Sequence, residues 1–258
     1  ILSGCATPVS VKHVDIQTAY RINTANTLSS AEPSVASSTV LRRHGLLDRF
    51  EKEPAVVLAE LHKGLKPADD EDKLFALAEL SLLHAQQTND RAYFLASAVY
   101  AWSLLYPGDG TGMQLQPSDP RFRLSYDIYN QAVAQGLAAG DDAEENEVRL
   151  RAGNYKLPFG TLQVSLDESG MSWGGYPLDR FISTNVLEVD GLRNRYLKSG
   201  IGVPLAASLA KTQSSVKNIG SNRLGPYIKV PVTALLRFEN ARTSLSKGKI
   251  QGRIEVYA

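Results

Sequence analysis

The chain has a single cysteine, Cys5, among its 258 residues and so cannot form an internal disulfide. It has no run of about 18 consecutive apolar residues, the length that a membrane-spanning helix requires. Its 28 basic and 27 acidic residues nearly balance, which excludes a global electrostatic attraction to nucleic acid or to anionic lipid. Association with a membrane would therefore depend on a covalent lipid, and we predict no nucleic-acid partner.

The cysteine lies in the segment Leu2-Ser3-Gly4-Cys5. Signal peptides of bacterial lipoproteins end in a short pattern, in which apolar residues are followed by a small residue, a glycine and a cysteine. An ordinary buried cysteine is the alternative, but the next residues, 6–10, are those of a polar linker. We therefore predict that residues 1–5 end a signal peptide whose earlier part precedes this sequence, and that Cys5 is lipidated and binds a membrane of the bacterial cell envelope. Ala6 takes the place of the aspartate that retains lipoproteins at the inner membrane of enteric bacteria, which favours the outer membrane.

The first half of the chain carries few strand signals. Residues 6–37 are rich in Ser, Thr, Ala and Pro and are predicted to form a flexible tether. In residues 38–140 the apolar spacing predicts about five helices packed as hairpins, among them a central helix over 91–106 that is apolar on most sides. The pair over 70–106 faintly resembles a tetratricopeptide hairpin, although no second copy follows.

The second half has a different period. Residues 141–153 are acidic and polar and predict an exposed linker. Over 154–258 apolar and polar residues alternate, which predicts a β-rich, mainly antiparallel region. The last alternating run reaches Ala258 without a turn signal, so we expect further chain beyond it. The predicted fold class is α+β, a helical hairpin bundle followed by this β-rich region.

One segment, Gly170-Met171-Ser172-Trp173-Gly174, matches the G-x-S-x-G motif of serine hydrolases. The motif acts where a strand runs through a tight turn into a helix, but Gly175 and Pro177 disfavour a helix here. The serine also needs a base, and the α/β-hydrolases place their histidine after it. All four histidines precede Ser172 in this chain: His13, His44, His62 and His84. We therefore predict a hairpin turn with Trp173 packed inward, and no catalytic residue.

Other candidate sites have weaker patterns. The histidine spacings match no metal-binding motif, and no phosphate-binding or dinucleotide-binding glycine loop occurs, so we predict neither a metal nor a cofactor. We expect His62 and His84 on helix surfaces or at hairpin edges. Arg193 and Arg195 form a local basic cluster that could bind a phosphate-containing ligand. A solvated turn, or a pairing with an acidic residue such as Glu188, is the alternative.

Several segments, taken in order, resemble the N-terminal half of large bacterial lipoproteins of the α/β-hydrolase type. Besides the Cys5 segment they are Leu77–His84, Ala98–Trp102, Asp119–Arg123, Leu157–Gly160, Gly191–Tyr196, Gly202–Ala207 and Lys229–Arg237. The resemblance covers nearly the whole chain. It implies an esterase- or lipase-like parent protein in which a downstream domain supplies the catalytic serine, acid and histidine. None of those residues maps onto this sequence.

Three functions follow from these observations. The first is a membrane-anchored, non-catalytic region of a serine hydrolase, which carries its partner, the hydrolase domain, on the same polypeptide. The second is a self-standing lipoprotein that binds a protein partner through the helices of 70–106. The third is a hydrolase that uses Ser172 itself. We expect the first.

Overall fold

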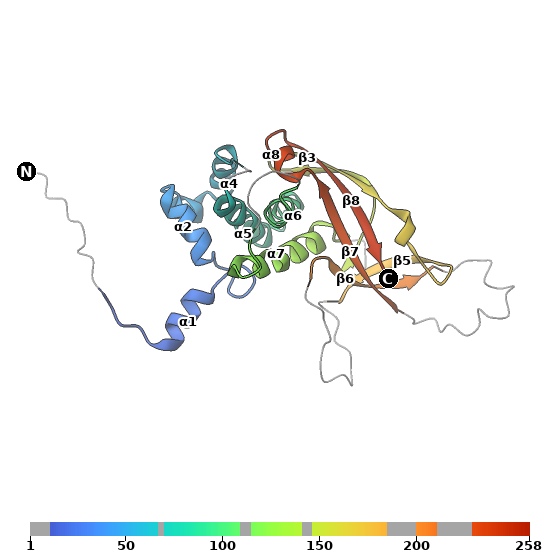
Figure 1. The fold of residues 1–258 in the computed structure, drawn as a ribbon, viewed down its shortest axis with the longest axis horizontal. Coiled ribbons are helices and arrows are strands. Elements are labelled where there is room, and N and C mark those ends of the chain that lie inside the picture. The colour runs from blue at the N-terminus through green and yellow to red at the C-terminus, as the bar shows by residue number, and fades with distance from the viewer. Residues whose placement is uncertain (1–10, 67–69, 109–114, 141–145, 185–199, 211–228) are drawn as a thin grey trace, which may run out of the picture.

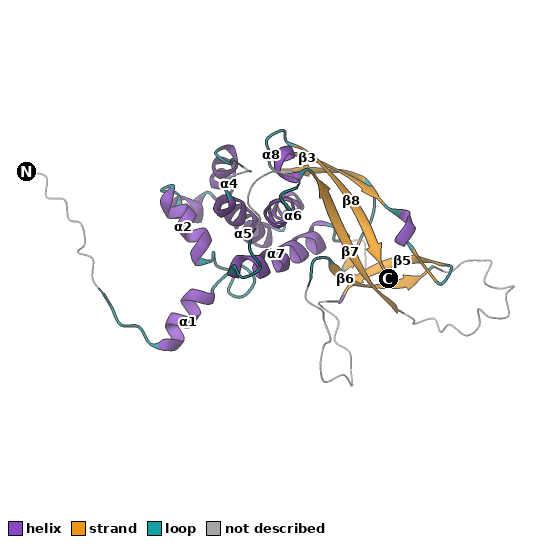
Figure 2. Ribbon diagram, viewed as in Figure 1, coloured by secondary structure: helices purple, strands orange, loops and turns teal. Residues whose placement is uncertain are grey.

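The computed structural model of the chain describes residues 11–66, 70–108, 115–140, 146–184, 200–210 and 229–258. Helices form one side of the molecule and a twisted sheet forms the other (Figures 1 and 2). The helices are α1 (Ile16–Thr24), α2 (Val35–Arg43), α3 (Leu47–Lys52), α4 (Pro54–Lys63), α5 (Glu71–Thr88), α6 (Arg91–Leu105), α7 (Pro120–Gly136) and α8 (Ala241–Leu245). The strands are β1 (Glu147–Val148), β2 (Gly153–Leu157), β3 (Gly160–Leu166), β4 (Ser172–Trp173), β5 (Tyr176–Ser183), β6 (Val203–Leu209), β7 (Lys229–Glu239) and β8 (Lys249–Tyr257).

Short polar side chains and prolines begin several of these helices. The side chains of Asp15, Ser34, Asp90 and Asp119 each accept a hydrogen bond from a backbone N–H of the first turn. Pro54 and Pro120 occupy first-turn positions, where a missing N–H costs nothing. These residues account for the starts of the helices, and α6 begins where the predicted helix over 91–106 begins.

The core is centred on α5 and α6, which are buried throughout Leu74–Ala85 and Phe94–Leu105. Helix α6 packs between α5 and α7 and also contacts β2, β7 and α8. The prediction of a central helix with apolar residues on most sides is confirmed for α6. The buried side chains of helices and sheet form one continuous cluster, so α6 is buried on one side by the sheet.

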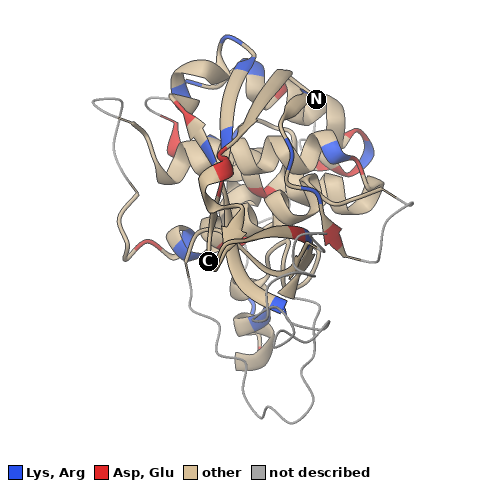
Figure 3. Ribbon diagram, turned by 90° about the vertical axis from the view of Figure 1, so that its right-hand side faces the viewer, with Lys and Arg blue, Asp and Glu red and all other residues tan. Residues whose placement is uncertain are grey.

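The eight strands form a mixed sheet with the order β1-β5-β6-β7-β8-β3-β2, and β4 pairs with β5 beside this path. Neighbouring strands are antiparallel except β3 and β8, which run parallel, with Leu162 opposite Ile250 and Leu166 opposite Ile254. Alternate residues of β3, β7 and β8 face the core. The exposed alternate residues of β7 and β8 include charged residues of both signs, and Figure 3 marks the acidic and basic residues on the ribbon, seen from the sheet side.

The predicted fold is wrong. Among the described residues there are eight helices and one mixed sheet of eight strands, not a clear five-helix hairpin bundle followed by an antiparallel region. The short helices α1 to α4 do not pair as hairpins around a core of their own. Helix α8 follows β7 and precedes β8 in the chain, so it belongs to the second half. The parallel pair joins strands more than 80 residues apart, and local periodicity carries no information about such a partner.

Two predicted connections also contain regular structure. Helix α1 and the start of α2 lie within residues 6–37, the predicted tether, and Thr27, Ser34 and Ser37 there are buried. Strand β1 lies within 141–153, the predicted linker. In both segments tertiary contacts stabilise structure that a polar composition does not indicate.

Candidate functional site

The most unusual group in the described part of the molecule is the carboxylate of Glu79, which is fully buried in the middle of α5. Its Oε1 accepts hydrogen bonds from the backbone N–H groups of Thr27 (3.2 Å) and Ser34 (3.1 Å). Its Oε2 accepts from the hydroxyls of Ser34 (2.6 Å) and Ser37 (2.5 Å). A buried carboxylate is costly unless donors surround it, and these bonds supply the donors. We refer to Glu79, Thr27, Ser34 and Ser37 as the Glu79 clasp.

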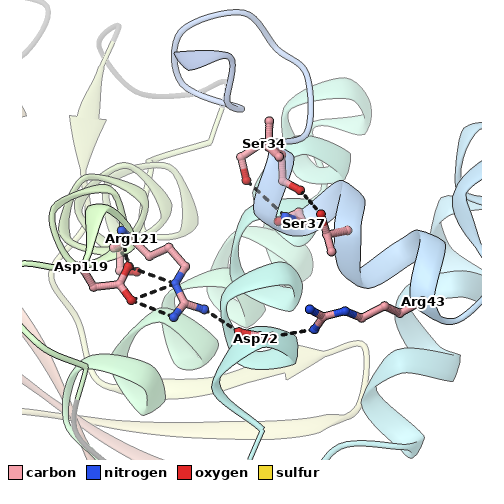
Figure 4. A network of polar contacts seen from close by, with 9 residues as sticks. Ser34, Ser37, Arg43, Asp72, Asp119 and Arg121 are labelled. Atoms are coloured by element: carbon pink, nitrogen blue, oxygen red, sulfur yellow. Dashed lines mark hydrogen bonds and ion pairs between the residues drawn. The ribbon is translucent and has the colours of Figure 1, made fainter. Parts of the chain in front are cut away.

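The clasp fastens the N-terminal segment to α5. Ser34 also caps α2, because its hydroxyl oxygen accepts from the N–H of Ser37 at 3.3 Å. Ser34 and Ser37 lie next to each other at the start of α2 (Figure 4). Thr27 adds a bond from its hydroxyl to Gln86, about two helical turns further along α5. The clasp therefore fixes both the entry of the chain and the start of α2 on α5.

A chain of ion pairs joins the end of α2 to the starts of α5 and α7, as Figure 4 shows. Asp72 on α5 bonds Arg43 of α2 (2.9 Å) and Arg121 of α7 (2.7 Å), and Arg121 also bonds Asp119 (2.8 Å). The hydrogen bond with Arg121 lowers the pKa of Asp119, and the same bond raises the pKa of Arg121. The side chains of Asp72 and Arg43 are half exposed or more, so these pairs orient three helices and add little stability.

His62 and His84, expected on helix surfaces or at hairpin edges, both pack against aromatic rings. His62 of α4 is half-buried, and His84, near the end of α5, meets Tyr93 across the α5–α6 hairpin. The Nδ1 atom of His62 lies 2.7 Å from the hydroxyl of Tyr100, and its ring stacks on Phe159 at 4.5 Å. Burial lowers the pKa of His62 and raises that of Tyr100. This cluster joins α4, α6 and the β2–β3 turn.

His84 is 8 % exposed and meets the edge of Tyr93 at a ring distance of 4.5 Å. Burial lowers the pKa of His84, and this effect outweighs the nearby charge of Asp90, which acts to raise it. Its Nδ1 is buried and has no hydrogen-bond partner. Neither imidazole is paired with a nucleophile, and both belong to the packing of the helical side.

Ser172 lies in β4, exposed, opposite Pro177 of β5. Gly174 and Gly175, with φ of +56° and +82°, form the turn of this β4–β5 hairpin. A strand-turn-helix elbow is thus not what surrounds Ser172, and no hydrogen bond joins it to a histidine among the described residues. The predicted hairpin is present, whereas Trp173 is 43 % exposed and not packed inward.

Three predicted site residues, Cys5, Arg193 and Arg195, lie outside the described residues. Within the described ranges, no group of three or more His, Cys, Asp or Glu is placed to hold a metal ion. A search of the same ranges finds no helix with the length and apolarity needed to span a membrane.

Sequence reasoning missed Glu79, and one signal could have found it. Leu77-Ala78-Glu79-Leu80 places an acidic residue among apolar ones in the middle of a predicted helix. Its partners, 42 to 52 residues earlier, could not be found in this way. Comparison of the chain with protein-family profiles, with curated proteins and with solved structures finds no match.

Proposed function

We propose that this chain is the membrane-anchored, non-catalytic N-terminal region of a serine hydrolase of the α/β-hydrolase type, esterase- or lipase-like, with lipid on Cys5. The Glu79 clasp is the observation that supports the anchoring role best. It holds residues 27–37 on α5 through a carboxylate that is fully buried. A pull on Cys5 would therefore reach the core of the molecule within about 22 residues of chain, at most roughly 75 Å.

Helix α1, between Cys5 and the clasp, adds a second argument. It has no buried residue, and Ile16, Tyr20 and Ile22 are 51–88 % exposed. At 3.6 residues per turn Ile16 and Tyr20 share one side of the helix, whereas Ile22 lies nearly opposite Tyr20. Exposed apolar side chains on a short helix are compatible with contact at a bilayer to which the chain is already tethered, and Figure 1 shows α1 on the helical side, away from the sheet.

The other two candidate functions have less support. A scaffold that binds through the helices of 70–106 needs exposed side chains there, yet twelve consecutive residues of α5 and twelve of α6 are buried. A hydrolase that uses Ser172 needs a base, and Ser172 is in a β-hairpin without one. The catalytic groups of the proposed enzyme would therefore lie downstream of residue 258, as the resemblance to hydrolase lipoproteins implies.

Fractionation of cells that express the full-length gene product tests the anchor. We expect the wild type in the membrane fraction with an N-terminal peptide that carries acyl chains by mass spectrometry, and a Cys5→Ala variant in the soluble fraction. Ser3→Thr, which leaves the cysteine in place, is the matched control and should remain membrane-bound. Equal soluble fractions for wild type and Cys5→Ala would overturn the anchor.

A second measurement tests the non-catalytic role. The full-length gene product should hydrolyse p-nitrophenyl butyrate, and Ser172→Ala should leave kcat/KM unchanged within about twofold, whereas loss of a nucleophile costs many orders of magnitude. An inactive Ser172→Ala protein with unchanged folding would place the chemistry in this chain and overturn the proposal. A full-length product without a downstream G-x-S-x-G elbow and histidine would do the same.

A further inference from the structure

A groove of about 560 Å³ lies on the polar face of the sheet where β2, β3, β7 and β8 meet α8. Amides line its floor, at Asn154, Gln163 and Gln251. Ser244, Lys247 and Lys249 stand at the side formed by α8 and the start of β8. Leu162 and Ile250 of the same strands are buried in the core, so the groove lies on the face of the sheet opposite α5 and α6, with α8 at its side.

The floor of the groove is a row that the sheet register builds. Asn154 of β2 is opposite Gln163 of β3, Gln163 is opposite Gln251 of β8, and Gln251 is opposite Glu239 of β7. Four strands at a spacing of about 4.8 Å make this row roughly 14 Å long. A second row, two residues along, places Thr161 opposite Lys249. Because positions i and i+2 share a face, both rows project into the same space.

Six polar side chains of the groove have no hydrogen-bond partner within the described ranges, whereas Glu239 lies near Arg253. Among the described residues, no side-chain hydrogen bond is made by Asn154, Gln163, Gln251, Ser244, Lys247 or Lys249. On the same face, next to the groove, Arg237 and Arg253 are paired with Glu255, and the hydroxyl of Tyr257 also bonds Glu255. The sheet therefore satisfies its charges outside the groove and leaves a fixed row of donors and acceptors open inside it.

The chemistry of the row selects a ligand class. Each amide offers one carbonyl acceptor and two N–H donors, which complement the neighbouring hydroxyls of a sugar. The two lysines outnumber Glu239, whose carboxylate is near Arg253 at 3.5 Å, so the groove favours an anion. A carboxylate or phosphate on the sugar would meet the lysine side while its hydroxyls lie along the amide row.

We propose that this groove binds an anionic glycan, a short saccharide chain bearing carboxylate or phosphate groups. This function is independent of the anchor and of ester hydrolysis. Its aromatic-free lining provides hydrogen bonds and charge but no ring stacking. We therefore expect a Kd of about 1 mM, the affinity of a few net hydrogen bonds.

Saturation-transfer difference NMR on the sugar protons, with the full-length gene product, tests the proposal. The probes are trigalacturonate, which carries carboxylates, glucose 6-phosphate, which carries a phosphate, and maltotriose as the neutral control. We expect binding of at least one anionic probe and at least fivefold weaker binding of maltotriose, since a charged hydrogen bond is worth about twice a neutral one. The stronger of the two anionic probes identifies the kind of anion that the groove prefers.

Variants assign the binding to the groove. The double variant Lys247→Ala/Lys249→Ala should raise the Kd of the anionic probe about tenfold. The double variant Gln163→Ala/Gln251→Ala should raise this Kd by a similar factor without changing the net charge. Lys229→Ala, at the other end of β7, removes a lysine outside the groove; it is the control and should leave the Kd unchanged. Absence of binding up to 20 times the expected Kd, equal binding of maltotriose, or a Kd that is the same in all variants would each overturn the proposal. Because the readout needs neither lipid nor hydrolysis, its failure is distinct from failure of the proposed function.

Discussion

Tyr129 on α7 completes the hydrogen bonding of β7 at the point where the neighbouring strand ends. Strand β6 reaches β7 only as far as the pair Val203 and Ala234. Beyond it, the hydroxyl of Tyr129 donates to the carbonyl of Leu236 at 2.6 Å and accepts from the N–H of the same residue at 2.9 Å. Burial raises the pKa of Tyr129, so the hydroxyl keeps the proton that it donates. One side chain thus replaces a missing strand residue.

We expect Tyr129→Phe to lower the free energy of unfolding by about 1–3 kcal/mol, because it leaves a buried N–H and a buried carbonyl of Leu236 without partners. Urea denaturation followed by circular dichroism measures the change. Tyr20→Phe is the matched control, since Tyr20 is 70 % exposed, and it should stay within about 0.5 kcal/mol of the wild type. A Tyr129→Phe protein as stable as this control would show that water satisfies Leu236.

Sequence reasoning reached half of this arrangement. The spacing of Leu124, Ile128 and Tyr129 after Asp119-Pro120 predicts the helix and its inward face, and both are present in α7. The partner of the hydroxyl is 107 residues away. A local pattern cannot predict this partner, because a tyrosine in a helix has the same spacing whether its hydroxyl bonds to water or to a strand.

At the scale of elements, the Glu79 clasp decides whether residues 27–37 form a tether or part of the body. The segment is rich in serine and threonine, and this composition predicts a flexible chain. The same hydroxyls and backbone N–H groups become ligands of one carboxylate once α5 is folded. Helix α2 also buries Val40 and Leu41, so tertiary contacts outweigh a weak local pattern.

We expect Glu79→Gln to release this segment locally. The amide keeps one acceptor oxygen and turns its NH₂ group toward the N–H and hydroxyl donors of the clasp, so two or more of the bonds to Thr27, Ser34 and Ser37 are lost. Hydrogen exchange of peptides that cover 27–37 should become at least tenfold faster, which corresponds to about 1.4 kcal/mol of local stability. Peptides from β7 and β8 should keep their protection.

Glu60→Gln is the control for this exchange measurement, because Glu60 is 52 % exposed and pairs with Arg49 on the surface. It should change no peptide by more than about twofold, since exposed pairs contribute little. Unchanged protection of 27–37 in Glu79→Gln would mean that the apolar face of α2 holds the segment without the carboxylate. The anchoring role that we propose would then lose its main structural support.

At the scale of the whole molecule, the strand order of the sheet depends on contacts between distant segments that no local rule specifies. The parallel pairing of β3 and β8 begins beside Gly160, where an added Cβ would lie 1.9 Å from the carbonyl oxygen of Gly248. The alternating pattern identified these strands as strands. It could not supply their order or the parallel direction, because both depend on which distant backbone comes close.

One core extends across the boundary between the predicted helical region, 38–140, and the predicted β-rich region, 154–258. Trp102 of α6 is 5 % exposed and lies 5.6 Å from Tyr129 and 6.0 Å from Phe238 of β7, measured between ring centroids. The buried guanidinium of Arg242 in α8 donates to the carbonyl of Ser103 in α6 at 2.7 Å. Helices and sheet therefore share the surface that stabilises each of them.

We expect the helices and the sheet to unfold in a single cooperative transition. In a Trp173→Phe variant Trp102 is the remaining tryptophan of residues 1–258, and its emission reports the joint between α6 and β7. With this part of the chain isolated as a fragment, the urea curves from Trp102 emission and from helical circular dichroism at 222 nm should coincide within about 0.2 M. Trp102→Phe, which retains the half-exposed Trp173 of the hairpin, is the control and should show a much smaller change in emission on unfolding. If the helical signal persists after Trp102 has become exposed, the helices are stable without the sheet, and residues 38–140 fold as a unit of their own.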